Sequence, residues 1–253
     1  MSLSTKPCHY GFTLVELAIV LIIVTLLTGG LLMSVTTQRD NIAAAETQRL
    51  LVNAQDALIG FAAANGRLPC PASPGSKGTE NPAGGNCINP WDGFLPAITL
   101  SLTPSDANGY ALDGWGNPIR YALTTDNAAG LCATPCFSTT NGIKTAWNTS
   151  VGALQLAPDL RVCSTSTGKT GGAAADCAVG NELTKNGVAI IFSRGKNGAA
   201  TPTSADEIAN GDADRLFVSH TPTPAGANEF DDLVIWLSPN ILYNKMIAAG
   251  RLP

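Results

Sequence analysis

Charge is scarce in this chain, and histidine is nearly absent. Charged residues make up 13% of the 253 residues, and the formal net charge is −4. Because the sequence has no basic stripe, we expect no nucleic-acid partner. The two histidines are His9 and His220. No zinc-protease or nucleophile-elbow pattern surrounds His220, and the carboxylates are too scattered to form an acid–base pair, so the sequence indicates that this protein is not an enzyme.

One stretch has a partial likeness to a nucleotide site. Gly168-Lys169-Thr170 ends as a phosphate-binding loop does, but Cys163 stands where that motif requires its first glycine. No strong apolar strand precedes the stretch, as a phosphate loop needs. We therefore interpret it as an ordinary loop rich in serine, threonine and glycine.

A long apolar run lies near the N-terminus. The residues from Leu17 to Gln38 carry no charge, and a helix of about 20 such residues is long enough to cross a membrane. Glu16 stands at the start of this run. A carboxylate inside a bilayer costs roughly 2.5–3.5 kcal/mol, so its presence there usually marks a function.

Two common explanations of an apolar N-terminal run fit less well. A secretory signal peptide has a shorter apolar core, of about 7–15 residues, followed by a small-residue cleavage site. Here the run is longer and no Ala-x-Ala follows it. A plain membrane anchor explains the length of the run, but neither Glu16 nor the glycine before Phe12.

The stretch Gly11-Phe12-Thr13-Leu14-Val15-Glu16, with the run behind it, resembles the N-terminus of type IV prepilins and type II secretion pseudopilins. In that family a leader is cut after a glycine and the new N-terminal phenylalanine is methylated. The resemblance implies processing between Gly11 and Phe12 by a prepilin peptidase. It also implies that Phe12 and Glu16 act in assembly, where the Glu16 carboxylate pairs with the methylated amine of a neighbouring subunit.

On this interpretation the chain has four segments. They are a cleaved leader (1–11), a transmembrane half of the N-terminal helix (12–38), an amphipathic half of that helix (39–65) and an extracytoplasmic globular domain (66–253). Good helix formers fill the amphipathic half, and Gly66 with Pro69 marks its end. Lys6 precedes the apolar run, so the positive-inside tendency keeps that end in the cytoplasm and places the domain in the periplasm.

The cysteine count indicates disulfides. There are seven cysteines, of which Cys8 lies in the leader. An even number of remaining cysteines in an exported domain points to disulfide bonds. Six cysteines allow 15 pairings, and their order favours three local loops: Cys70–Cys87, Cys132–Cys136 and Cys163–Cys177. A metal site is the alternative, but the pair at 132 and 136 has no partner pair at zinc-like spacing.

The remaining pattern predicts an α+β fold: a long N-terminal helix packed on a small antiparallel sheet, loop-rich and stapled by disulfides. The strand candidates are Ile119–Thr124, Gly187–Ser193 and Leu233–Leu237. A short C-terminal helix should follow, with Ser238 as its N-cap, Pro239 in its first turn and Gly250 at its end.

A turn motif precedes the first of these strands. Asp113-Gly114-Trp115-Gly116-Asn117-Pro118 resembles the Asp-Pro-Trp-Gly-Asn-Pro signature of major pseudopilins, with Gly114 in place of the proline. Its glycines and the Asn-Pro pair predict a turn that feeds the strand. The alternative is a generic aromatic turn.

The same resemblance raises the question of a calcium site. In relatives, a loop between the last strands binds calcium through aspartates and carbonyl groups, and calcium takes six to eight oxygen ligands. Asn197 stands where an aspartate is typical and Lys196 adds a repelling charge, so a solvated acidic loop is the favoured alternative. Calcium is the one cofactor that the resemblance suggests, and its candidate ligands are Asp206, Glu207, Asp231 and Asp232.

The resemblance thus implies a structural subunit of a type IV pilus or type II secretion pseudopilus, assembled into a helical filament from the inner membrane. The implied partners are copies of the same chain, other pilins or pseudopilins, the prepilin peptidase and the inner-membrane assembly platform. Before assembly the subunit would cross the inner membrane once. The alternative is a minor pilin that acts as an adhesin or ligand-binding module on such a filament.

Overall fold

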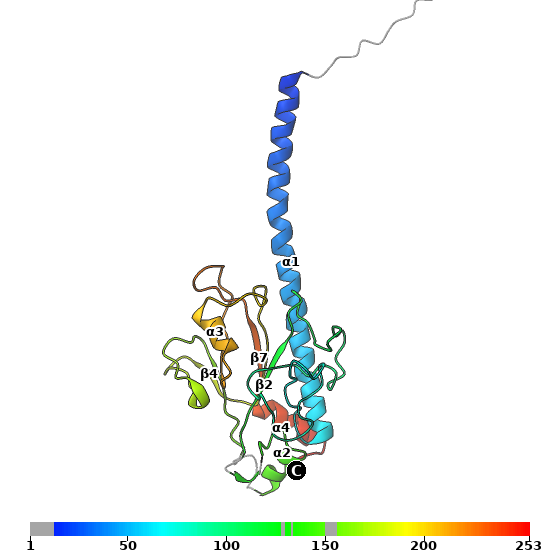
Figure 1. Cartoon of the computed structure of the whole chain (residues 1–253), viewed down its shortest axis with the longest axis vertical. Coiled ribbons are helices and arrows are strands. Elements are labelled where there is room, and N and C mark those ends of the chain that lie inside the picture. Colours follow the sequence, from blue (N-terminus) through cyan, green and yellow to red (C-terminus); the bar gives the residue numbers. More distant parts are fainter. Residues whose placement is uncertain (1–12, 128–129, 133, 150–155) are drawn as a thin grey trace, which may run out of the picture. The chain divides into compact units, whose positions relative to one another are not determined.

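The structure is a computed structural model that describes residues 13–127, 130–132, 134–149 and 156–253. The chain divides into two units, Met1–Ile42 and Ala43–Pro253. Helix α1 (Leu14–Asn65) begins in the first unit and ends in the second (Figure 1). The long N-terminal helix expected from the sequence is therefore present, and it passes through Gly29 and Gly30 without a break.

The first turns of α1 expose large apolar side chains. No helix in the described part of the chain combines the length and the apolarity that a membrane crossing requires. The predicted transmembrane half, 12–38, is therefore not confirmed. Among the described residues, the exposed apolar side chains of this part of α1 are Leu14, Val15, Leu17, Ile19, Val20, Leu21, Ile22, Ile23, Val24, Leu26 and Leu27.

The last turns of α1 form one side of the main core. Leu51, Ala54, Leu58 and Ala62 recur at three- and four-residue spacing and are fully buried, as expected for the apolar face of a helix that packs on a domain. The helix ends at Asn65 and is followed by Gly66, whose positive φ of 66° suits glycine. The amphipathic half of the helix thus packs as the sequence predicts.

A four-stranded antiparallel sheet faces this helix (Figure 1). Its strands are β1 (Gly93–Phe94), β2 (Arg120–Leu123), β5 (Ala189–Ser193) and β7 (Leu233–Leu237), in the order β1-β2-β5-β7. Because side chains alternate along a strand, Tyr121 and Ile191 join the core under α1, whereas Ala122 and Ile190 point to a second cluster. All five residues of β5 are buried, so this sheet needs cover on both faces.

A second, three-stranded sheet supplies that cover, and the sequence did not predict it. Its strands are β3 (Leu160–Cys163), β4 (Glu182–Gly187) and β6 (Leu216–Val218), in the order β4-β3-β6, and β3 pairs with β6 in parallel. Leu160, Val162 and Phe217 pack on the second face of the first sheet. The prediction of a single small antiparallel sheet was thus incomplete, because these strands are short and β4 is largely polar and exposed.

Short helices complete the domain. They are α2 (Gly142–Thr149), the 3-10 helix η3 (Gly172–Ala174), α3 (Ala205–Gly211) and α4 (Pro239–Ala248). The Ser238 hydroxyl accepts a hydrogen bond from the Ile241 N–H and caps α4, and Gly250 follows that helix with a positive φ of 68°. Both ends of α4 therefore lie where the sequence predicts them.

The three local disulfides expected from the cysteine order are all present. They join Cys70 to Cys87, Cys132 to Cys136 and Cys163 to Cys177. The Cys70–Cys87 disulfide closes a loop that contains Glu80, and Glu80 accepts a hydrogen bond from Arg67, just before the loop, in a nearly buried ion pair at 2.7 Å. Glu80 also accepts from the Cys70 N–H at 3.2 Å, so the ion pair and the disulfide fix the same end of the loop.

We expect Cys70→Ser to destabilise the domain by about 3 kcal/mol, because the disulfide closes a loop of 17 residues whose closure entropy the reduced chain regains on unfolding. Denaturant unfolding of the full chain in detergent measures this, and Cys87 should then react with thiol reagents. Cys132→Ser is the matched control. Its loop spans a separation of only 4, so its loss should be about 1 kcal/mol smaller. An unchanged unfolding midpoint for Cys70→Ser would contradict the argument.

Candidate functional site

The described N-terminus of α1 forms a reciprocal cap. The Glu16 carboxylate accepts hydrogen bonds from the Thr13 N–H (3.0 Å) and the Thr13 hydroxyl (2.9 Å), and that hydroxyl accepts from the Glu16 N–H (3.2 Å). This is the capping-box arrangement, which satisfies backbone groups that a helix start leaves without partners. Within a single chain, Glu16 therefore has local donors and lies at the positive end of the helix dipole.

Sequence reasoning named Glu16 but missed Thr13. The signal was the Thr-x-x-Glu spacing at the start of an apolar run, which is the sequence signature of a capping box. Gly11 and Phe12, the predicted processing residues, lie outside the described residues.

The turn around Trp115 is organised by one buried carboxylate. Asp113 accepts from the Trp115 N–H (2.9 Å) and the Asn117 N–H (2.7 Å), and its second oxygen accepts from the Ser193 hydroxyl at 2.6 Å. The Asn117 side chain donates to the Gly195 carbonyl at 2.7 Å. The turn before β2 is thereby tied to the end of β5 and to the loop that follows it.

Gly114 brings the same turn against α1. Its N–H donates to the Thr47 hydroxyl at 2.9 Å, and a Cβ at this position would lie only 2.4 Å from the Ala43 carbonyl oxygen. Real Cβ atoms do not approach backbone so closely, so this contact excludes any side chain. The pseudopilin signature has a proline at this position, whereas this chain has Gly114. The close packing of the turn on α1 accounts for that difference.

Three of the four carboxylates predicted as calcium ligands come together. Oxygens of Glu207, Asp231 and Asp232 lie within 4.8 Å of one another. Glu207 accepts from the Asp231 N–H at 3.2 Å, and both of its oxygens accept from the Asn197 side chain. The second oxygen of Asp231 accepts from the Asn197 N–H at 3.2 Å, while the first is buried without a hydrogen-bond partner among the described residues.

Gly195 makes room for this cluster. It has a φ of 61°, and a Cβ there would lie 2.2 Å from an Asp231 carboxylate oxygen. Glycine is thus required at this position both by the backbone conformation and by the close approach of Asp231.

Asp206 belongs to a different group of side chains. It accepts from the Ser166 N–H at 2.6 Å, and its other oxygen faces the His220 ring at 3.2 Å. Asp206 and Glu207 are adjacent on α3, and successive residues of an α-helix point about 100° apart. Their carboxylates therefore reach different neighbours, and Asp206 lies outside the cluster.

One comparison with known proteins identifies the N-terminal segment. Residues 6–32 match the sequence profile of a family described as a prokaryotic N-terminal methylation motif. The chain carries the prepilin-type cleavage and methylation signal of type IV pilins and pseudopilins. The resemblance seen in the sequence is thereby confirmed for this segment. No curated protein and no solved structure shows significant similarity to the chain.

This prepilin-type signal supports a type IV pilin or pseudopilin, and a structural protein rather than an enzyme. It implies assembly with other pilins and recognition by a prepilin peptidase, and it fits an extracytoplasmic filament assembled from the inner membrane. Thr13 and Glu16 lie within the matched residues. The capping box at the start of α1 therefore lies within the segment that matches the prepilin-type signal.

The carboxylate cluster beyond the matched residues carries unfavourable charge. Burial raises the pKa of Asp231 from 3.8 to about 6 and the pKa of Asp232 from 3.8 to about 7. The charge of Glu207 acts in the same direction on both. A cluster of this kind is more stable when it holds a proton or a cation.

Without added cations, the domain should lose stability as the pH rises from about 5 to about 8. The folded-state pKa values of Asp231 and Asp232 lie above 3.8, so the folded chain holds protons that the unfolded chain has released, and that stabilisation disappears as pH passes 6 and 7. Melting temperatures of the full chain in a metal chelator test this. Asp232→Asn should flatten the slope, whereas Asp56→Asn on the exposed side of α1 should not. A melting temperature that rises over this range contradicts the expectation.

Proposed function

We propose that this protein is a structural subunit of a type IV pilus or a type II secretion pseudopilus. The subunit is inserted once into the inner membrane with its domain in the periplasm, is cleaved before Phe12, and is assembled into a helical filament. The observation that carries the proposal is the prepilin-type signal at residues 6–32, which overlaps the start of a continuous helix.

The exposed apolar side chains of α1 support this role. A soluble monomer rarely leaves so many large apolar side chains in water, and here they occupy the helix from Leu14 to Leu27. Lipid would cover them before assembly, and neighbouring copies of the same helix would cover them afterwards. Between helices in an apolar surrounding, packing and polar pairs determine the association.

Glu16 would supply the polar pair. In the single chain its carboxylate is satisfied by Thr13, which lowers the cost of holding it in the membrane. On assembly it would meet the methylated N-terminal amine of a neighbouring copy. An ion pair in a surrounding of low dielectric constant is strong, and removing one partner leaves a costly unpaired charge. Glu16 would thus set the register of subunits.

We expect Glu16→Ala to be made, inserted and cleaved normally, but to reduce the filament yield in the native host by more than about tenfold, because the neighbour's amine is left without its partner. Glu16→Gln is the matched control, since it keeps the capping acceptor but removes the charge. If the charge sets the register, both variants fail to assemble, whereas a capping role predicts that Glu16→Gln assembles. Sheared filaments quantify the yield, and mass spectrometry of the N-terminus reports cleavage.

Two outcomes would contradict this role for Glu16. If Glu16→Ala assembles as well as the unmodified chain, Glu16 is not the register charge. If the variant accumulates uncut, the carboxylate serves recognition by the peptidase. A mature chain that does not begin at Phe12 would overturn the filament proposal itself.

We also propose that Glu207, Asp231 and Asp232 hold a calcium ion. Their carboxylates converge within 4.8 Å, and the buried Asp231 oxygen without a partner offers a free ligand. Calcium takes six to eight oxygens and accepts water among them, so three carboxylates are an adequate protein contribution. The bound ion would neutralise like charges that the fold holds together, and would link α3, which carries Glu207, to the two residues before β7.

Calcium at about 100 times its dissociation constant should stabilise the full chain by about 2.7 kcal/mol over the chelator-treated protein. Asp231→Asn should abolish this shift and raise the stability of the calcium-free protein. Asp206→Asn is the control, because Asp206 lies outside the cluster and its loss should leave the calcium shift unchanged. The same melting temperature with calcium and with chelator would refute the site.

A second candidate function is that of a minor pilin that binds a ligand through its domain. It is favoured by a cleft of about 540 Å³ at the first turn of α4, which lies within the size range of ligand sites.

A further inference from the structure

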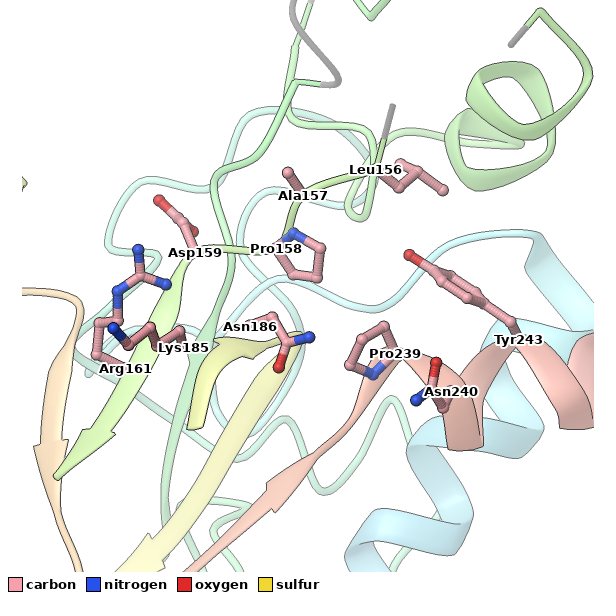
Figure 2. A pocket seen from close by; sticks show the side chains of 10 residues that line it. All are labelled: Leu156, Ala157, Pro158, Asp159, Arg161, Lys185, Asn186, Pro239, Asn240 and Tyr243. Atoms are coloured by element: carbon pink, nitrogen blue, oxygen red, sulfur yellow. The ribbon is translucent and has the colours of Figure 1, made fainter. Parts of the chain in front are cut away.

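The cleft at the start of α4 is built from three separate parts of the domain. The segment Leu156–Asp159 forms one side, β3 and β4 form another, and the first residues of α4 close the third (Figure 2). Figure 2 shows Arg161 and Lys185 gathered at one end with Asp159 near them, and Tyr243 at the other. The volume of the cleft is about 540 Å³.

Two buried polar atoms of the cleft lining have no hydrogen-bond partner in the described part of the chain. One is the Arg161 Nε, which has a carboxylate oxygen of Asp176 at 3.2 Å. The other is the hydroxyl of Tyr243, a residue that is only 7% exposed. Figure 2 shows this hydroxyl directed across the cleft toward Pro158. The ring is held by an edge contact with Trp147, at 5.3 Å between ring centres. A buried hydroxyl without a partner is costly, so the site favours an occupant that bonds to it.

Two amides add exposed hydrogen-bonding groups. Asn186 and Asn240 line the cleft and are exposed. The side-chain oxygen of Asn186 accepts from the Thr184 hydroxyl at 2.9 Å. The NH₂ group of Asn186 takes no part in that hydrogen bond. A side-chain amide both donates and accepts. The cleft therefore offers donors and acceptors side by side, as hydroxyl groups of a ligand require.

The charges at the cleft are compensated within the domain. Each charged lining residue lies within 4 Å of an opposite charge: the pairs are Arg161 with Asp176 (3.2 Å), Lys185 with Glu182 (2.7 Å) and Asp159 with Arg215 (3.6 Å). An anion or a cation in the cleft would have to compete with these pairs. The electrostatics thus favour an uncharged ligand.

The rest of the lining is apolar. Pro158 and Pro239 lie between the two polar ends of the cleft (Figure 2). Ligand sites typically combine such apolar walls with a few placed polar groups. An uncharged ligand with many hydroxyl groups and an apolar C–H face matches all of these features, because its hydroxyl groups satisfy the amides and Tyr243 while its C–H face packs on the prolines.

We propose that this cleft binds a neutral saccharide. The proposal deepens the second candidate function, and it does not require that the chain assembles into a filament. Filament formation and sugar binding are therefore measured separately, and one can fail without the other.

Saturation-transfer NMR on the full chain tests this with four probes: glucose, galactose, mannose and N-acetylglucosamine. A zwitterionic detergent is required, because sugar-headed detergents would compete. We expect at least one probe to bind with a dissociation constant of about 1 mM, in the range of a ligand of this size. Asn240→Ala and Tyr243→Phe should each weaken binding about threefold to tenfold, as the loss of one hydrogen bond does.

Asn89→Ala is the matched control. Asn89 is exposed and does not line this cleft, so its variant should bind as the unmodified chain does. Asn240 is exposed, so Asn240→Ala keeps the test valid even if Tyr243→Phe fails to fold. The proposal is overturned if no probe binds at about 20 mM, if both cleft variants bind normally, or if glucuronate binds more than about tenfold tighter than glucose.

Discussion

Burial of one face of α1 against the antiparallel sheet is the constraint on which the domain from Ala43 onward depends. Leu51, Leu58 and Ala62 fill the space above Tyr121 and Ile191, and all five are fully buried. At about 25 cal/mol per Å² of apolar surface removed from water, such a face is the main source of stability in a domain of this size. The other elements cover, close or tether this core.

The turn at Asp113 links the helix to the rest of the domain. Its buried carboxylate binds the backbone of its own turn and the Ser193 hydroxyl at the end of β5, while Gly114 touches Ala43 of α1. A carboxylate that accepts several hydrogen bonds in a buried position orders the groups around it, so Asp113 is the residue that aligns helix, sheet and loop.

The two polar sites of the domain differ in how their charge is balanced. The cluster of Glu207, Asp231 and Asp232 consists of three carboxylates, and burial raises the pKa of both aspartates, although the charge of Arg194 lowers that of Asp232. The charged side chains of the cleft at α4 are paired with opposite charges. Its buried polar atoms without a hydrogen-bond partner in the described part of the chain are the neutral Tyr243 hydroxyl and the Nε of Arg161, whose charge Asp176 balances. The first site therefore favours a cation, and the second favours an uncharged ligand. Both lie outside the residues that match the prepilin-type signal.

Local features of the sequence determined the prepilin-type signal, α1, β5, β7, the caps of α4 and the three disulfide pairings. Each depends on residues close together in the chain: helix formers, apolar runs, cap residues, and cysteines separated by short loops. Only the tertiary structure decided the second sheet, the separation of Asp206 from Glu207, and the cleft that joins Asp159 to Tyr243. These depend on which distant segments pack together, as β3 does with β6 in parallel. Strands of three or four residues carry too little periodicity to specify a distant partner. The structure shows that β3 and β6 supply the side chains that cover the second face of β5.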